Sequence, residues 1–208
     1  MNKLYLSKIF FLTLILFVSK WFFSFYFSFE ENFVTKAFFD LKDYQYFALI
    51  YNFANLDFNP SYDPSLSNLK YIPIPINSVI FHSIFLKIFN LYGFLLAEFI
   101  IIFLFFCIFF KFFKELGVKN FESLILVLFI FCIPSIIDIL SLNNFTYVAA
   151  LHEFFNLRIP RPLVTQIYFF LFLLLLIFKN KNEKFKIWEL FFLGFLFSSM
   201  WGSFFYNL

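Results

Sequence analysis

The sequence predicts an all-α fold, a polytopic integral membrane helix bundle with five spans and one short interfacial or partial helix. Apolar residues make up 62% of the 208 positions and charged residues only 14%, whereas an ordinary soluble domain is about a quarter charged. The mean hydropathy is +0.86. The apolar residues come in blocks of about twenty, the length needed to cross about 30 Å of hydrocarbon. The bilayer is therefore the first expected partner.

Composition excludes several other classes of protein. The 43 phenylalanines, with many Ile, Lys and Asn residues, are typical of AT-rich bacterial codon usage, so single phenylalanines carry little functional information. The net charge is only +3 and no basic cluster alternates with aromatic residues, so we expect no nucleic acid partner. Cys107 and Cys132 lie inside apolar blocks, where cysteine behaves as a small hydrophobe. We therefore expect no disulfide framework and no metal site.

The spans are predicted from the apolar blocks of a single transmembrane domain, residues 1–208. The first block follows Lys3 and Lys8 and lacks a small-residue cleavage site, so it reads as an uncleaved anchor. Residues 77–90 are apolar but too short to cross, and are expected at the interface or partway into the membrane. The last block ends at Leu208 without a polar tail, which indicates a chain truncated at its C-terminus. The predicted spans are residues 9–29, 92–112, 121–140, 163–178 and 188–208.

The orientation follows from the lysines and arginines, which are retained on the cytoplasmic side. Nine of the sixteen basic residues lie at the N-terminus and in the short connections 111–119 and 179–186. The longer connections 30–75 and 141–162 hold five. These counts predict a multi-pass protein of the cell membrane with a cytoplasmic N-terminus, and the two longer connections become outward loops.

The first outward loop holds the candidate catalytic acids. Asp40 and Asp43 stand three residues apart at the start of a predicted surface helix, residues 43–54, which puts both carboxylates on one face near its positive end. One of them could act as a general base on an acceptor hydroxyl. The alternative is helix capping in a solvated loop.

The second outward loop holds the candidate binding residues. Arg158 and Arg161 occur in R-I-P-R-P, where proline stiffens the backbone and would hold two guanidinium groups at a set distance, suited to a phosphate. The alternative is an ordinary lipid head-group anchor. His152 and Glu153 could polarise a leaving phosphate, but two ligands without a third do not predict a metal site.

Glu98 is the one acid of the predicted span 92–112, about 9 Å below the outer surface at the α-helical rise. Ionisable residues inside a membrane are candidates for a functional site by default. We consider either a role in substrate binding or simple pairing with Lys20 in the first span. His82, in the short segment, is expected to be an interfacial polar residue.

The order of these parts resembles the N-terminal half of the GT-C class of membrane glycosyltransferases. The matching elements are a first span, an outward loop with the segment D-L-K-D-Y-Q-Y, a proline-marked re-entry Y-I-P-I-P-I-N-S, and a short helix ending in K-I-F-N-L-Y-G-F. Further spans with a second polar outward loop follow. The chain departs from the class in being about half the usual length, which fits a GT-C-like N-terminal module or fragment.

The resemblance implies sugar transfer from a polyprenyl-phosphate-linked donor to a saccharide, lipid or protein acceptor on the outer face. Asp43 or Asp40 then matches the first-loop acid that acts on the acceptor, and Arg158 and Arg161 become partners of the lipid phosphate. The resemblance does not identify a cofactor. Two alternatives also stay open, a transporter or flippase for a lipid-linked saccharide and a non-catalytic membrane protein. The absence of a visible duplication disfavours transport.

Overall fold

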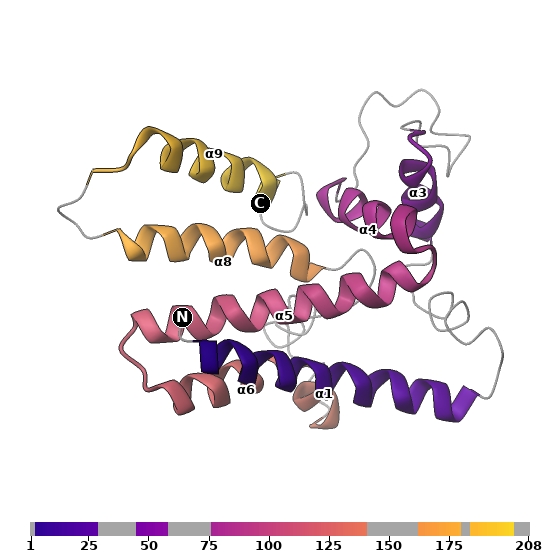
Figure 1. Cartoon of the computed structure of the whole chain (residues 1–208), viewed down its shortest axis with the longest axis horizontal. Coiled ribbons are helices and arrows are strands. Elements are labelled where there is room, and N and C mark those ends of the chain that lie inside the picture. Colours follow the sequence, from indigo (N-terminus) through magenta and orange to yellow (C-terminus); the bar gives the residue numbers. More distant parts are fainter. Residues whose placement is uncertain (1–2, 29–44, 58–75, 141–161, 180–183, 202–208) are drawn as a thin grey trace.

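The computed structural model describes residues 3–28, 45–57, 76–140, 162–179 and 184–201, and this part of the chain is helical without strands (Figure 1). The all-α prediction is confirmed for these residues. The helices are α1 (Lys3–Ser28), α3 (Gln45–Ala54), α4 (Ile76–Phe89), α5 (Tyr92–Glu115), α6 (Asn120–Ile139), α8 (Pro162–Phe178) and α9 (Ile187–Trp201).

Each predicted apolar block contains one helix within the described residues, and the described bounds differ mainly at polar ends. Helix α1 begins at Lys3 instead of residue 9, and α5 continues to Glu115 instead of residue 112. Straight-chain Lys and Glu residues are good helix formers, so they extend a helix beyond its apolar block. Helix α6 continues through Pro134 and ends at Ile139.

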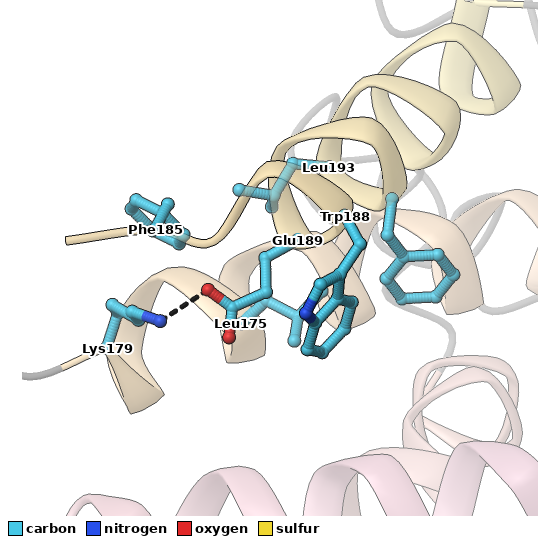
Figure 2. A pocket seen from close by; sticks show the side chains of 7 residues that line it. Leu175, Lys179, Phe185, Trp188, Glu189 and Leu193 are labelled. Carbon is cyan, nitrogen blue, oxygen red and sulfur yellow. Dashed lines mark hydrogen bonds and ion pairs between the residues drawn. The ribbon is translucent and has the colours of Figure 1, made fainter. Parts of the chain in front are cut away.

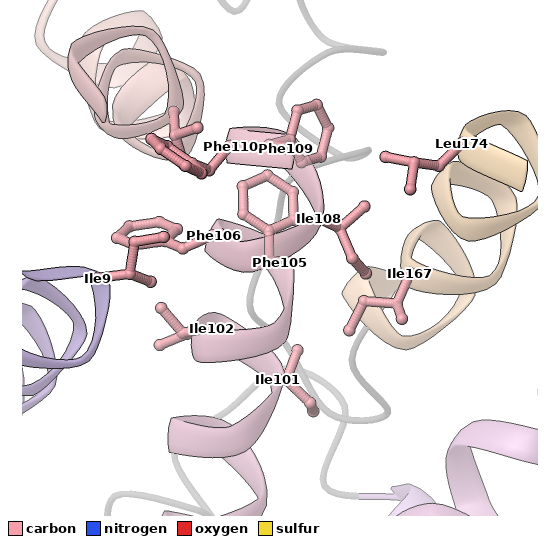
Figure 3. Close-up of a cluster of buried hydrophobic side chains, with 11 residues drawn as sticks. Ile9, Ile101, Ile102, Phe105, Phe106, Ile108, Phe109, Phe110, Ile167 and Leu174 are labelled. Carbon is pink, nitrogen blue, oxygen red and sulfur yellow. The ribbon is translucent and has the colours of Figure 1, made fainter. Parts of the chain in front are cut away.

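Helix α5 is the centre of the bundle. It contacts α1, α4, α6 and α8, and eleven of its residues are buried. Its side chains Phe105, Phe106 and Phe109 pack with Ile9 of α1 and Ile167 of α8 in one apolar cluster (Figure 3). The rings of Phe109 on α5 and Phe170 on α8 lie 4.2 Å apart between centroids. Helix α5 thus positions the other helices.

Helices α1 and α5 run antiparallel. The rings of Tyr5 and Phe110 stack at 5.6 Å near one end of the pair, and those of Phe17 and Phe99 meet edge-on at 5.6 Å further along. Figure 1 shows the start of α1, the α5–α6 turn, the end of α8 and the start of α9 at the same end of the bundle.

Helices α8 and α9 are also antiparallel. Phe172 lies 6.2 Å from Phe197 between ring centroids, and Lys179 after α8 forms a salt bridge with Glu189 in the first turn of α9. We call the end that holds the α5–α6 and α8–α9 connections the lysine end. Its lysines in or next to these helix ends are Lys111, Lys114, Lys119, Lys179, Lys184 and Lys186.

Helices α3 and α4 form a unit at the start of α5, away from the lysine end (Figure 1). Leu49, Ile50 and Phe53 of α3 pack on Val79 of α4 and Phe94 of α5. The α4–α5 turn contains Asn90 at φ 54°, a conformation that Asn adopts more readily than most residues. The surface-helix prediction is confirmed as a helix, and Asp43 lies outside the described residues.

Gly93 permits the close approach of α5 to α4. A Cβ atom at this position would lie 2.2 Å from the backbone oxygen of Phe85, so no larger residue fits without a backbone shift. The α4–α5 junction is therefore tightly packed.

In the described part of the chain, α5 is the helix that passes a test of length and composition for a membrane span. Shorter apolar segments of 10–17 residues occur in the other long helices and in α4. The 14 residues of α4 extend about 21 Å at about 1.5 Å per residue. This length falls short of a bilayer core of about 30 Å, and the partial or interfacial placement of α4 stays a prediction.

Candidate functional site

Most of the site residues predicted from the sequence lie outside the described part of the chain. This holds for both candidate acids of the first outward loop and for all candidates of the second. They are Asp40, Asp43, His152, Glu153, Arg158 and Arg161. Their mutual arrangement therefore stays a prediction, and Glu98 is the predicted site residue that the structure describes.

Glu98 lies in the second turn of α5, and its side chain is 0% exposed. Its Oε2 atom accepts a hydrogen bond of 3.1 Å from the indole Nε1 of Trp21 on α1. The carboxyl group is enclosed by protein, so it cannot be a group that meets substrate from an open surface in this conformation. The side chain of Lys20, its expected partner, lies outside what the structure describes.

His82 is buried between helices, and its position at the membrane interface stays a prediction. Its side chain is 1% exposed and its ring stacks on Phe94 of α5, 6.0 Å between centroids and 29° between planes. Nδ1 lies 2.7 Å from the backbone oxygen of Ser78, one turn earlier on α4. Because a carbonyl oxygen only accepts, Nδ1 carries the proton in this contact. The sequence does not predict this burial, because it depends on α5 covering a face of α4.

Two further polar residues of α4 tie it to helices that are distant in sequence. The Ser83 hydroxyl lies 2.9 Å from the Ile50 oxygen on α3 and 2.7 Å from the Val79 oxygen on its own helix. The Asn77 amide donates a hydrogen bond of 2.9 Å to the Ser199 oxygen on α9. Helix α4 is thus fixed on both sides by side-chain hydrogen bonds.

Sequence reasoning missed Trp21, Asn77 and Ser83 because their partners come from other helices. One signal was present, since Ser78 and His82 stand four residues apart on a mostly apolar helix. That spacing places them on one face. A polar face on an apolar helix indicates a protein-facing side.

The described residues contain no group of three or more His, Cys, Asp or Glu side chains that could hold a metal ion. The buried polar groups of α1, α4 and α5 form separate hydrogen bonds, from Trp21 to Glu98 and from His82 and Ser83 to backbone oxygens. The bonds of Trp21 and Ser83 join different helices and therefore help to fix their positions.

An open pocket lies at the lysine end, between α8 and α9 (Figure 2). Its cavity volume is about 210 Å³. The salt bridge between Lys179 and Glu189 forms its polar wall, and Lys179 Nζ lies 5.2 Å from the centroid of the Phe185 ring. The other lining residues are Leu175, Trp188, Phe192 and Leu193. We call this feature the α8–α9 pocket.

Comparison with known proteins adds no relative. No family model, no curated protein and no solved structure matches the chain.

Proposed function

We propose that the chain is a multi-pass membrane module of a glycosyltransferase that takes sugar from a polyprenyl-phosphate-linked donor on the outer face of the membrane. The observation that carries the proposal is the separation of the two ends of the bundle. Lysines gather at one end, and the α3–α4 unit lies at the other.

The alternating helix directions support five crossings. Helix α5 runs antiparallel to α1, and α9 runs antiparallel to α8. If the lysine end is cytoplasmic, as the retention of basic residues on that side predicts, the α3–α4 unit belongs to the outer face. Helix α4 is then the element that sits across the outer end without crossing, because it is too short.

The contacts of α4 support a shared site for the two outward loops. Helix α4 contacts both α3 and α8. In the sequence, Asp43 precedes the first residue of α3 by two positions, and Arg161 directly precedes the first residue of α8. The two candidate segments therefore lead into α3 and α8, which both contact α4.

The proposed reaction needs one base and one phosphate partner. An acceptor hydroxyl would attack C1 of the donor sugar, forming a C1–O bond to the acceptor and breaking the C1–O bond to the lipid phosphate. Asp43, or Asp40, would take the proton of the hydroxyl. Arg158 and Arg161 would stabilise the departing polyprenyl phosphate by charge-assisted hydrogen bonds. Glu98 would support the site indirectly, by holding α1 and α5 in position.

Transport of a lipid-linked saccharide is the second candidate, and buried Glu98 favours it. Acids inside a membrane often belong to proton pathways. The two candidates differ in the fate of the donor, since a transporter moves it intact and a transferase releases polyprenyl phosphate.

The test is to reconstitute the purified full-length protein in liposomes with polyprenyl-phosphate-linked hexose, labelled in the sugar. The expected result is release of polyprenyl phosphate with transfer of label to an added saccharide acceptor. Movement of intact donor between leaflets, without release, would replace the enzyme with the transporter. If the donor is neither cleaved nor moved, a non-catalytic membrane role is the remaining explanation.

A further inference from the structure

Helices α3 and α4 pack against each other and yet expose opposite kinds of surface. Helix α3 buries Leu49, Ile50 and Phe53, whereas Tyr51 and Asn55 are exposed. The Asn55 amide donates a hydrogen bond of 3.1 Å to the Tyr51 oxygen on this exposed side. Apolar residues inside and polar residues outside are the usual arrangement of a helix at a protein surface. The outer side of α3 is therefore suited to water.

Helix α4 has the reverse arrangement. Its Ser78, His82 and Ser83 side chains are buried, while its isoleucines are exposed. Water would favour the opposite, because exposing apolar groups and burying polar groups both cost free energy. The isoleucines recur at every fourth residue, so they share one face of the helix. We call it the isoleucine face, and its members, 36–62% exposed, are Ile76, Ile80, Ile84 and Ile88.

A hydrogen bond places the start of α4 away from the outer end of the bundle. The Asn77 amide donates to the Ser199 oxygen, and Ser199 lies about 18 Å along α9 from Ile187 at the lysine end. Tyr92, the first residue of α5, lies about 28 Å along α5 from Lys111 at the same end. Helix α4 thus slopes inward by about 10 Å from its last residue to its first, and Figure 1 shows it reaching from the start of α5 toward the end of α9.

The polar residues next to the end of α4 agree with this slope. Lys87, Asn90 and Tyr92 are exposed, in the last turn of α4, in the α4–α5 turn and at the start of α5. Tyrosine is enriched at the level of lipid head groups, and a lysine near a helix end reaches this level with its long side chain. The isoleucine face therefore begins near the head groups and continues toward the acyl chains.

We propose that α4 is a helix that enters the membrane without crossing it, and that acyl chains of the outer leaflet cover its isoleucine face. A helix can enter hydrocarbon because its backbone groups bond within it. Exposed apolar side chains also occur on α1, α6 and α9, such as Phe11, Phe129 and Phe191. A partner protein would cover one face of the bundle, whereas hydrocarbon surrounds all of them. This inference rests on the membrane embedding and orientation in the proposed function and not on sugar transfer.

The test uses nitroxide spin labels on single cysteines in the full-length protein, with its native cysteines changed to Ala, in phosphatidylcholine liposomes. The label's collisions with oxygen, which concentrates in hydrocarbon, are compared with its collisions with a water-soluble nickel chelate. Labels at Ile80 and Ile84 should collide mainly with oxygen. A label at Ile76 should lie about 10 Å deeper in the membrane than one at Ile88.

Two exposed positions outside α4 are the matched controls. A label at Asn55 on α3 reports water, and a label at Phe129 on α6 reports hydrocarbon. Nickel contact at Ile80 and Ile84 equal to that at Asn55, with oxygen contact at Phe129, would overturn this inference alone. Nickel contact at Phe129 as well would overturn the membrane embedding too. Few collisions with either reagent at Ile84, with spectral broadening by a second label, would show that another copy of the chain covers the face instead of lipid.

Discussion

The indole nitrogen of Trp21 donates a hydrogen bond of 3.1 Å to the buried carboxyl group of Glu98, which joins α1 to α5 across 77 positions of sequence. Hydrogen bonds between helices in a membrane stabilise a protein by about 0.6 kcal/mol on average and about 1.7 at most. Trp21→Phe should therefore lower the free energy of unfolding by about this amount, measured by titration of the detergent-solubilised protein with a denaturing detergent.

Trp188→Phe is the matched control, because this indole is exposed on α9. It should change the unfolding free energy by less than about 0.5 kcal/mol, as is usual for surface substitutions. Glu98→Gln keeps a carbonyl acceptor for the indole and should be milder than Glu98→Leu. Equal losses for the two Trp variants would show that the bond contributes nothing specific.

Gly93 leads to the second prediction, which concerns the α4–α5 junction. Gly93→Ala puts a methyl group 2.2 Å from the Phe85 oxygen and 2.5 Å from its carbon, both of them backbone atoms. Overpacking of this kind costs about 1–3 kcal/mol, so we expect a comparable loss of stability in the same titration. Gly194→Ala is the control, because nothing lies within 4 Å of its added Cβ. A neutral Gly93→Ala variant would contradict the close packing of the two helices.

The hydroxyl of Ser83 leads to the third prediction, on the attachment of α3. Ser83→Ala removes the contact of 2.9 Å to the Ile50 oxygen, so α3 should open more often from α4. Amide hydrogen exchange in α3 should then be faster by about three- to tenfold, for a loss near 0.6–1.4 kcal/mol. Ser198→Ala, on the exposed side of α9, should leave exchange in α3 unchanged. No change with Ser83→Ala would mean that apolar packing alone holds α3.

The long helices could be predicted from the sequence because apolar blocks largely decide where they form. Residues 92–112 were predicted and Tyr92–Glu115 is observed, with the difference confined to the lysine-bearing end. Burial of polar groups could not be predicted in the same way, because it depends on which helix covers which. His82 was expected at an interface, and α5 covers it through Phe94. Glu98 could be singled out because an acid inside an apolar block is unusual. Its partner Trp21 could not, because one more aromatic residue in an apolar block is not unusual.

The fourth prediction concerns orientation and tests the five crossings. In a chain with Cys107 and Cys132 changed to Ala, a single cysteine is placed at Asp57, after α3, or at Lys119, before α6. An impermeant maleimide should label intact cells at position 57 and not at position 119, because basic connections stay in the cytoplasm. Permeabilised cells should be labelled at both. The reverse pattern would sink the proposed topology.

The last prediction concerns the chemistry of the two outward loops. It rests on the different roles of the acid, as general base, and of the arginine, as partner of the lipid phosphate. Loss of a general base costs about 10² to 10⁴ in rate without affecting a donor that the base does not touch. Asp43→Asn should therefore abolish transfer in the full-length protein and leave donor binding nearly unchanged. Arg158→Ala removes a charge partner of the lipid phosphate, so it should weaken donor binding as well as slow transfer.

The contrast between the two variants separates the roles, because a merely unfolded protein would lose both properties in both cases. Asp40→Asn shows which acid is the base, since the spacing of Asp40 and Asp43 alone does not choose between them. Normal transfer after both acids are changed would remove the first loop from the mechanism. If Arg158→Ala also keeps full donor affinity, the two loops share no site, and a non-catalytic membrane role explains the buried Glu98 better than catalysis does.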